Sequence, residues 1–238
     1  MHVDPAFLTL ALLVALAVIF DFMNGFHDAA NSIATIVSTR VLKPYQAVIW
    51  AAAFNFIAIW LFEPKVAATV GKGIIAPGFV DDAVILGALV GAIAWNVITW
   101  YFGIPSSSSH ALIGGMIGAA MAKAGVAPLV MPGIIRTTVF ILVAPLLGMV
   151  IGGAIMLALS WIFFRFPPAR LDRWFRLSQL FSSALYSIGH GSNDAQKTMG
   201  VIWLLLMARG LATPAHLPDW VIASCYTAIS FGTLCGGW

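Results

Sequence analysis

The stretch Asn24-Gly25-Phe26-His27-Asp28-Ala29-Ala30-Asn31 follows an apolar run from Ala6 to Phe20, and apolar character resumes after it. A second polar stretch, His190-Gly191-Ser192-Asn193-Asp194-Ala195-Gln196-Lys197, follows the apolar run that begins at Leu180. Polar groups at membrane depth are costly unless they are buried in protein or line a cavity. If these runs cross a membrane, the polar stretches predict where the functional residues lie.

The composition agrees with a membrane protein. Of the 238 residues, 61% are hydrophobic and 9% are charged, against roughly 25% charged in an ordinary soluble domain. The mean hydropathy is +0.97. The net charge of +3 is carried by short loops and forms no basic stripe, so we expect no nucleic-acid partner.

Other apolar segments are long enough, or nearly so, to cover a hydrocarbon core, which needs about 20 helical residues. These segments are 46–62, 83–102, 134–164 and the shorter 220–235. Pro145 is expected to bend the third. A third polar interruption, Gly103-Ile104-Pro105-Ser106-Ser107-Ser108-Ser109-His110, opens a stretch rich in Gly and Ala that ends at Lys123. The fold class expected is an all-α polytopic bundle with discontinuous helices.

An internal repeat relates the first two polar stretches. A shift of 166 residues carries Gly25 onto Gly191 and Asp28 onto Asp194. The basic segment 165–178 is predicted to be cytoplasmic by its excess of arginine, as is the Arg40–Lys43 loop. Residues 1–5 contain no Lys or Arg, so the N-terminus is expected outside, and an odd number of crossings leads from there to the cytoplasmic linker. The second copy then starts from the opposite face, and the repeat is inverted. The predicted organisation is a first repeat at 1–164, a cytoplasmic linker at 165–178 and the start of a second repeat at 179–238.

Four consecutive hydroxyl side chains after Pro105 predict an anion site. Hydroxyls together with the free backbone N–H groups of a helix N-terminus suit small oxyanions such as phosphate. The other interpretation is a serine-rich turn whose hydroxyls cap the helix.

Asp28 and Asp194 are carboxylates inside apolar spans, which marks an ion path or proton relay by default. The alternative is a structural role, such as a pair with Lys197. Two acids beside an anion would repel it, so a proton, a sodium ion or an anion-bound metal must accompany the anion. No HExxH spacing supports a zinc site, and neither a catalytic residue nor a resident metal is predicted.

Uncharged oxygens and amides complete the predicted site. Asn31, Ser192, Asn193 and Gln196 are able to hold either ion, whereas Lys197 pairs with an acid or with the substrate. The roles of His27, His110 and His190 stay open at this point. Cys225 and Cys235 are interpreted as packing residues.

The three polar motifs resemble those of the inorganic phosphate transporter (PiT) family. Residues 24–31 and 190–197 resemble its paired signatures, and Pro105–His110 resembles its helical-hairpin motif. The form of the motifs is most similar to the bacterial low-affinity phosphate permeases. The resemblance implies cation-coupled symport of inorganic phosphate, alone or as a metal–phosphate complex, by alternating access in the bacterial inner membrane. No cofactor is implied other than the co-transported proton or sodium ion.

The resemblance also implies which residues form the site. The substrate-binding residues would be Ser106, Ser107, Ser108, Ser109, Asp28, Asn31, Asp194 and Gln196. Asp28, Asn31 and Asp194 would also hold the coupling ion, and the chemistry of the side chains adds Asn193 and Lys197 to the coupling-ion residues. Inorganic phosphate and the lipid bilayer are the expected partners, and a homo-oligomer is compatible with the sequence.

The family also carries a second hairpin, which the 166-residue shift would place near residues 272–275. The chain stops at Trp238, so we expect a truncated member that is inactive alone. The alternatives left open are a transporter of another oxyanion such as sulfate, an intramembrane serine hydrolase using His110, and a structural subunit.

Overall fold

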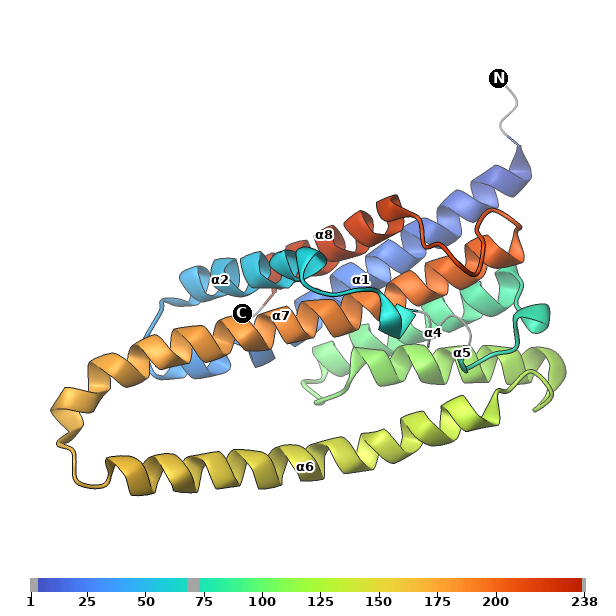
Figure 1. The fold of residues 1–238 in the computed structure, drawn as a ribbon. Coiled ribbons are helices and arrows are strands. Elements are labelled where there is room, and N and C mark those ends of the chain that lie inside the picture. Colours follow the sequence, from blue (N-terminus) through green and yellow to red (C-terminus); the bar gives the residue numbers. More distant parts are fainter. Residues whose placement is uncertain (1–3, 68–72, 237–238) are drawn as a thin grey trace.

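The structure is a computed structural model that describes residues 4–67 and 73–236, and long helices make up most of this part of the chain (Figure 1). The long helices are α1 (Pro5–Ser38), α2 (Pro44–Ile57), α4 (Asp82–Tyr101), α5 (Ser108–Ala124), α6 (Met131–Phe163), α7 (Pro168–Ala208) and α8 (Asp219–Cys235). Two short 3₁₀ turns, Ala58–Trp60 and Pro77–Phe79, lie between α2 and α4. The segments expected at 83–102, 134–164 and 220–235 thus correspond to α4, α6 and α8.

Three of these helices, α1, α4 and α6, are long and apolar enough to cross a membrane. None of the residues of α6 is buried, and Figure 1 shows this helix apart from the others. Pro145 lies inside α6 without ending it. An apolar helix with no buried side has to be covered by lipid or by other protein. The expectation of a helical membrane fold is confirmed.

The two signature stretches do not break their helices. α1 runs through residues 24–31 and α7 runs through residues 190–197. The expectation of discontinuous helices at these two places is therefore wrong. A continuous helix satisfies its own backbone, so the polar side chains need only face other protein. Asp21, Asn24 and Asp28 do so, because their spacing of three and four residues places them on one buried face. Much of the predicted linker 165–178 is likewise helical, since α7 begins at Pro168.

The serine stretch does interrupt the helical path. α4 ends at Tyr101, α5 begins at Ser108, and the two pack side by side as a hairpin. Figure 1 shows that this hairpin turns back part-way along α1 and α7. Pro105 precedes the first turn of α5 rather than occupying it, because Ser107 is the N-cap. The hairpin tip is therefore placed at depth, beside the helices that carry the two aspartates.

Two glycines of the repeat allow the helices to approach closely. α1 packs on α8, and a Cβ at Gly25 would lie 2.1 Å from the carbonyl oxygen of Ile229. α7 packs on α2, and a Cβ at Gly191 would lie 2.6 Å from the carbonyl oxygen of Asn55. Each glycine is thus required by the backbone of a neighbouring helix, which is the use of small residues expected in membranes.

Charged side chains connect the helix ends. At one end, Arg176 donates to the carbonyl oxygen of Arg40, so the two basic segments predicted to share a face lie together. At the other end, Lys123 pairs with Asp81 at 2.6 Å, and Arg209 pairs with Asp82. The hydrogen bond from Lys123, assisted by the backbone N–H of Val84, lowers the pKa of Asp81 below its usual value of 3.8.

Replacing Gly25 with alanine should destabilise the protein. The new methyl group would overlap the backbone of α8, and overpacking costs about 1–3 kcal/mol. Gly91→Ala is the matched control, because nothing lies within 4 Å of a Cβ there. Thermal unfolding in detergent should show a lower midpoint for Gly25→Ala alone. Equal midpoints for the two variants would contradict the close approach.

Replacing Asp81 with asparagine should have a small, pH-dependent effect on stability. Asparagine still caps α4, so the variant removes only the ion pair with Lys123. This ion pair is partly exposed and contributes under about 1 kcal/mol to the free energy of unfolding. A lowered pKa stabilises the folded state above the unfolded value of 3.8, and this contribution is lost as pH falls through the folded pKa. Unfolding midpoints of both proteins should therefore converge in acid, and a constant difference would refute the assignment.

Candidate functional site

The four serines at the hairpin tip have four different environments. Ser106 accepts a hydrogen bond from the indole N–H of Trp95 at 2.9 Å, and Ser107 caps α5 by accepting from the backbone N–H of His110. Ser108 is fully buried, and its hydroxyl has no hydrogen-bond partner among the described residues. Ser109 reaches α7. The capping interpretation thus holds for Ser107, and Ser109 is the serine that joins the carboxylates.

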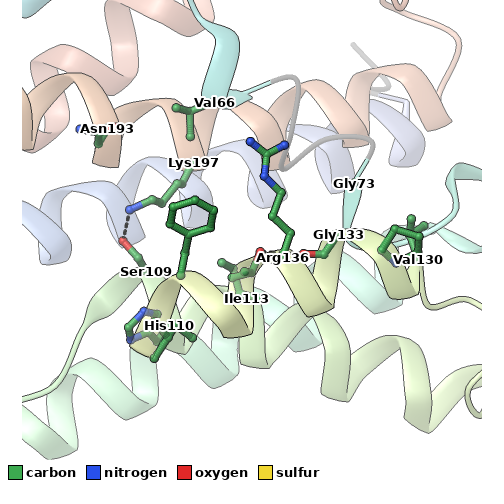
Figure 2. Close-up of a pocket in the computed structure, with 14 residues that line it drawn as sticks. Val66, Gly73, Ser109, His110, Ile113, Val130, Gly133, Arg136, Asn193 and Lys197 are labelled. Carbon is green, nitrogen blue, oxygen red and sulfur yellow. Dashed lines mark hydrogen bonds between the residues drawn. The ribbon is translucent and has the colours of Figure 1, made fainter. Parts of the chain in front are cut away.

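Lys197 joins the hairpin tip to α7. Its ammonium group lies 2.6 Å from Asp194 Oδ1. It also lies 2.5 Å from Ser109 Oγ, the hydrogen bond drawn in Figure 2. Ser109 Oγ is itself 3.3 Å from Asp194 Oδ1. The pair of Asp194 with Lys197, which the sequence left open, is therefore present. It places one positive charge, one negative charge and one hydroxyl in contact at the hairpin tip.

The two aspartates of the signatures lie on either side of His190. The Nε2 atom of His190 is 3.8 Å from Asp28 Oδ2 and 3.5 Å from Asp194 Oδ2. His27 also contacts Asp28, with its Nδ1 atom 2.8 Å from Oδ1. Asp28, His190 and Asp194 can offer ligand atoms within 4.8 Å of one another, which is close enough to hold a cation. We call these three residues the carboxylate cluster.

A cavity of about 820 Å³ (Figure 2) is lined by Lys197, which contacts Asp194 of the cluster. Ser109, His110, Asn193 and Lys197 line it, as does Arg136 of α6. Figure 2 shows the Arg136 guanidinium extending between α6 and the Val66 segment. Arg136 was not among the predicted site residues, although an arginine near the start of an apolar span was a signal that could have found it. The cavity therefore carries two cationic side chains, Lys197 and Arg136, beside a serine hydroxyl.

Some predicted site residues lie outside this group. Asn31 is exposed on α1. Gln196 is buried, and its side-chain oxygen accepts the backbone N–H of Val66 at 2.9 Å, so it holds the segment after α2. Asn193 donates to the carbonyl oxygen of Gly189 at 2.8 Å while lining the cavity. The structure thus assembles Asp28, Asp194, Ser109 and Lys197, with Asn193 at the margin.

Comparison with known families identifies the family of the chain. The chain matches the phosphate transporter family over residues 24–170 and 165–238. The chain belongs to the phosphate transporter family. Its three polar motifs all lie within the matched residues, and the resemblance inferred from them is confirmed. Members of this family are transporters, so the expectation that the chain is not an enzyme is confirmed as well.

Individual relatives of this phosphate transporter family member agree with the match. A protein of Rhizobium meliloti, named "Probable low-affinity inorganic phosphate transporter", is 55% identical over 100% of this chain and 72% of its own length. A Bacillus subtilis protein of the same name is 46% identical over 95% of this chain and 69% of its own length. The solved structure of a sodium-dependent phosphate transporter has a TM-score of 0.79 at 21% identity, covering 96% of this chain and 76% of that one. The last comparison shows a shared fold.

Proposed function

We propose that this chain moves inorganic phosphate by cation-coupled symport with alternating access. The observation that carries the proposal is the contact of Ser109 with Lys197 and Asp194. It brings the anion-binding tip of the hairpin to the carboxylates that would hold the coupling cation. The anion-binding part and the cation-binding part of a symport site are thus in contact with each other.

Phosphate would bind at the tip of α5. The hydroxyl of Ser109 and the ammonium of Lys197 face the cavity, and the first N–H groups of α5 lie at its positive end. Arg136 adds a second cation, and a guanidinium suits bidentate contact with an oxyanion. The names of the relatives support phosphate as the oxyanion.

Cation coupling follows from the charges of the same cluster. Asp28 and Asp194 are both buried, and only Asp194 has a lysine in contact among the described residues. A phosphate placed beside them adds negative charge at low dielectric, which is costly without a further positive charge. A proton, a sodium ion or a divalent metal that travels with phosphate would supply it. Asp28, Asp194 and His190 are the residues placed to bind that cation.

The packing of helices from one predicted repeat on helices of the other supports alternating access. α1 of the first repeat packs on α8 of the second, and α7 of the second packs on α2 of the first. Asn55 of α2 donates to Thr233 of α8 at 2.8 Å where these pairs meet. We propose that these are inverted repeats that move against each other, in the inner membrane of a bacterium. The hydrolase alternative has no support here, because the side-chain hydrogen bonds of Ser109 among the described residues are with Lys197 and Asp194 and not with a histidine.

Removing the Ser109 hydroxyl should weaken phosphate binding. Ser109→Ala loses one hydrogen bond to the anion, so the KM for uptake should rise about tenfold. Ser106→Ala is the matched control, since that serine accepts from Trp95 instead, and its KM should change less than about twofold. Initial rates of radiolabelled phosphate uptake, in cells that lack other phosphate transporters and express the full-length form of the protein, measure both. Equal changes in KM for the two variants would contradict the assignment of Ser109 to the phosphate site. If sulfate competed with radiolabelled phosphate as well as unlabelled phosphate does, the choice of phosphate as the substrate would be wrong.

Removing either carboxylate of the cluster should uncouple transport from its cation. Asp28→Asn and Asp194→Asn each remove a charged ligand, so gradient-driven phosphate accumulation should fall at least about tenfold. Asp172→Asn is the control, because Asp172 is exposed and pairs with Arg176. Uptake under imposed proton and sodium gradients, tested separately, identifies the coupling ion. Wild-type accumulation in both cluster variants would end the coupling role.

A further inference from the structure

A third carboxyl group lies outside the carboxylate cluster, at Asp21 of α1. Asp21 is 0% exposed. Its Oδ1 atom accepts the Thr198 hydroxyl at 2.9 Å, and its Oδ2 atom has no hydrogen-bond partner among the described residues. Asp21 has no part in the phosphate or cation contacts described above. A buried ionisable group inside a membrane helix is a functional candidate by default.

The surroundings of Asp21 hold little to stabilise a charge. Asp194 and Lys197 of α7 act on it electrostatically without a bond, and the Cys225 thiol of α8 lies beside it. A neutral hydroxyl and a weakly donating thiol are little compensation for an ionised carboxylate that is fully removed from water. The carboxyl therefore fits this place best while it carries a proton, and the unpartnered Oδ2 is the atom available to hold it.

Asp21 is connected to the carboxylate cluster along both helices. On α1, Asp21, Asn24 and Asp28 lie on one buried face, and the rise from Asp21 to Asp28 is about 10 Å. Asn24 lies between them, and its side-chain oxygen has no hydrogen-bond partner among the described residues. On α7, Thr198 follows Asp194 by one turn. Asn24 thus lies between Asp21 and Asp28 along α1, and Thr198, which donates to Asp21, lies one helical turn from Asp194 on α7.

The packing of the fold does not require an acid at this position. In the shift of 166 residues that carries Asp28 onto Asp194, Ser187 corresponds to Asp21 and Thr198 corresponds to Ser32. Ser187 is also 0% exposed. A serine therefore fills the corresponding place on α7, so the carboxyl of Asp21 is a feature of one copy only. A structural hydrogen bond to Thr198 would need no more than a hydroxyl or an amide.

We propose that Asp21 is a proton-binding site of the transporter, separate from the phosphate and cation contacts of the carboxylate cluster. This rests on the proposed symport. The O–H bond of the Asp21 carboxyl breaks when its proton passes to water reaching the site, and it re-forms when the next proton enters. Sodium fits less well, because a hard cation needs several oxygen ligands, whereas a thiol lies beside this carboxyl.

The test uses Asp21→Asn, which has nearly the same shape and resembles the permanently protonated carboxyl. In proteoliposomes, phosphate accumulation driven by a proton gradient should fall at least about tenfold, while phosphate/phosphate exchange should stay within about twofold of wild type, because exchange needs no proton release. Asp219→Asn, at the exposed start of α8, is the control and should change neither. Infrared spectra of the purified protein should lose one protonated-carboxyl C=O band in Asp21→Asn.

A second variant keeps the test independent of Asp21 itself. Thr198→Val preserves shape but removes the donor to Asp21, so proton release is harder and coupled accumulation should move to higher pH, again with exchange retained. Proton-driven accumulation by Asp21→Asn at the wild-type level would overturn the proposal, as would loss of exchange together with accumulation in a folded variant. A wild-type protein that exchanges phosphate but accumulates it on sodium alone would overturn it and leave the symport intact. A wild-type protein that exchanges no phosphate would overturn the proposed function first.

Discussion

The ion pair of Lys197 with Asp194 is the interaction on which the site depends. A lysine within a membrane-spanning bundle needs a counter-charge, and Asp194 supplies it 2.6 Å away on the same helix. The remaining donor capacity of the ammonium reaches Ser109, which fixes the tip of the α4–α5 hairpin against α7. The ion pair thereby holds Ser109 beside the carboxylates, at the edge of the cavity that both Ser109 and Lys197 line.

The two signature stretches serve this arrangement by keeping their helices whole. In α1 and α7 the backbone N–H and C=O groups bond to each other within the helix. The polar groups that these two helices offer inside the membrane are therefore side chains. Glycine allows the close contacts of α1 with α8 and of α7 with α2, which leaves Asp28 and Asp194 facing His190. The hairpin contributes the free backbone N–H groups at the start of α5, where an anion would meet a hydroxyl and an ammonium.

The sequence predicted the helical membrane fold, the four-serine tip and the two aspartates, because charge and hydroxyl groups are rare in apolar runs. The prediction that the helices break at the two signature stretches was wrong, because polar residues spaced by three and four are compatible with a break or with a buried polar face of a continuous helix. It could not separate Ser109 from Ser106, which depends on where α5 begins. Gln196 was assigned to the site although it binds the backbone of Val66, a contact between distant segments. Arg136 was not predicted as a site residue because it lies near the boundary of an apolar span, where a charged side chain is expected at the membrane surface.

The charge balance of the site explains why an anion and a cation would bind together. The two carboxylates and Lys197 leave one net negative charge when the histidines are neutral, and phosphate makes the sum more negative. Every cation that joins the cluster therefore favours phosphate, and phosphate favours that cation by the same factor, because coupling between binding sites is reciprocal. Arg136 contributes a fixed charge to the cavity and shifts this balance without being transported. A protonated Asp21 removes one further negative charge from the same region, so its proton would be bound more tightly while phosphate is present and released more readily once phosphate has left.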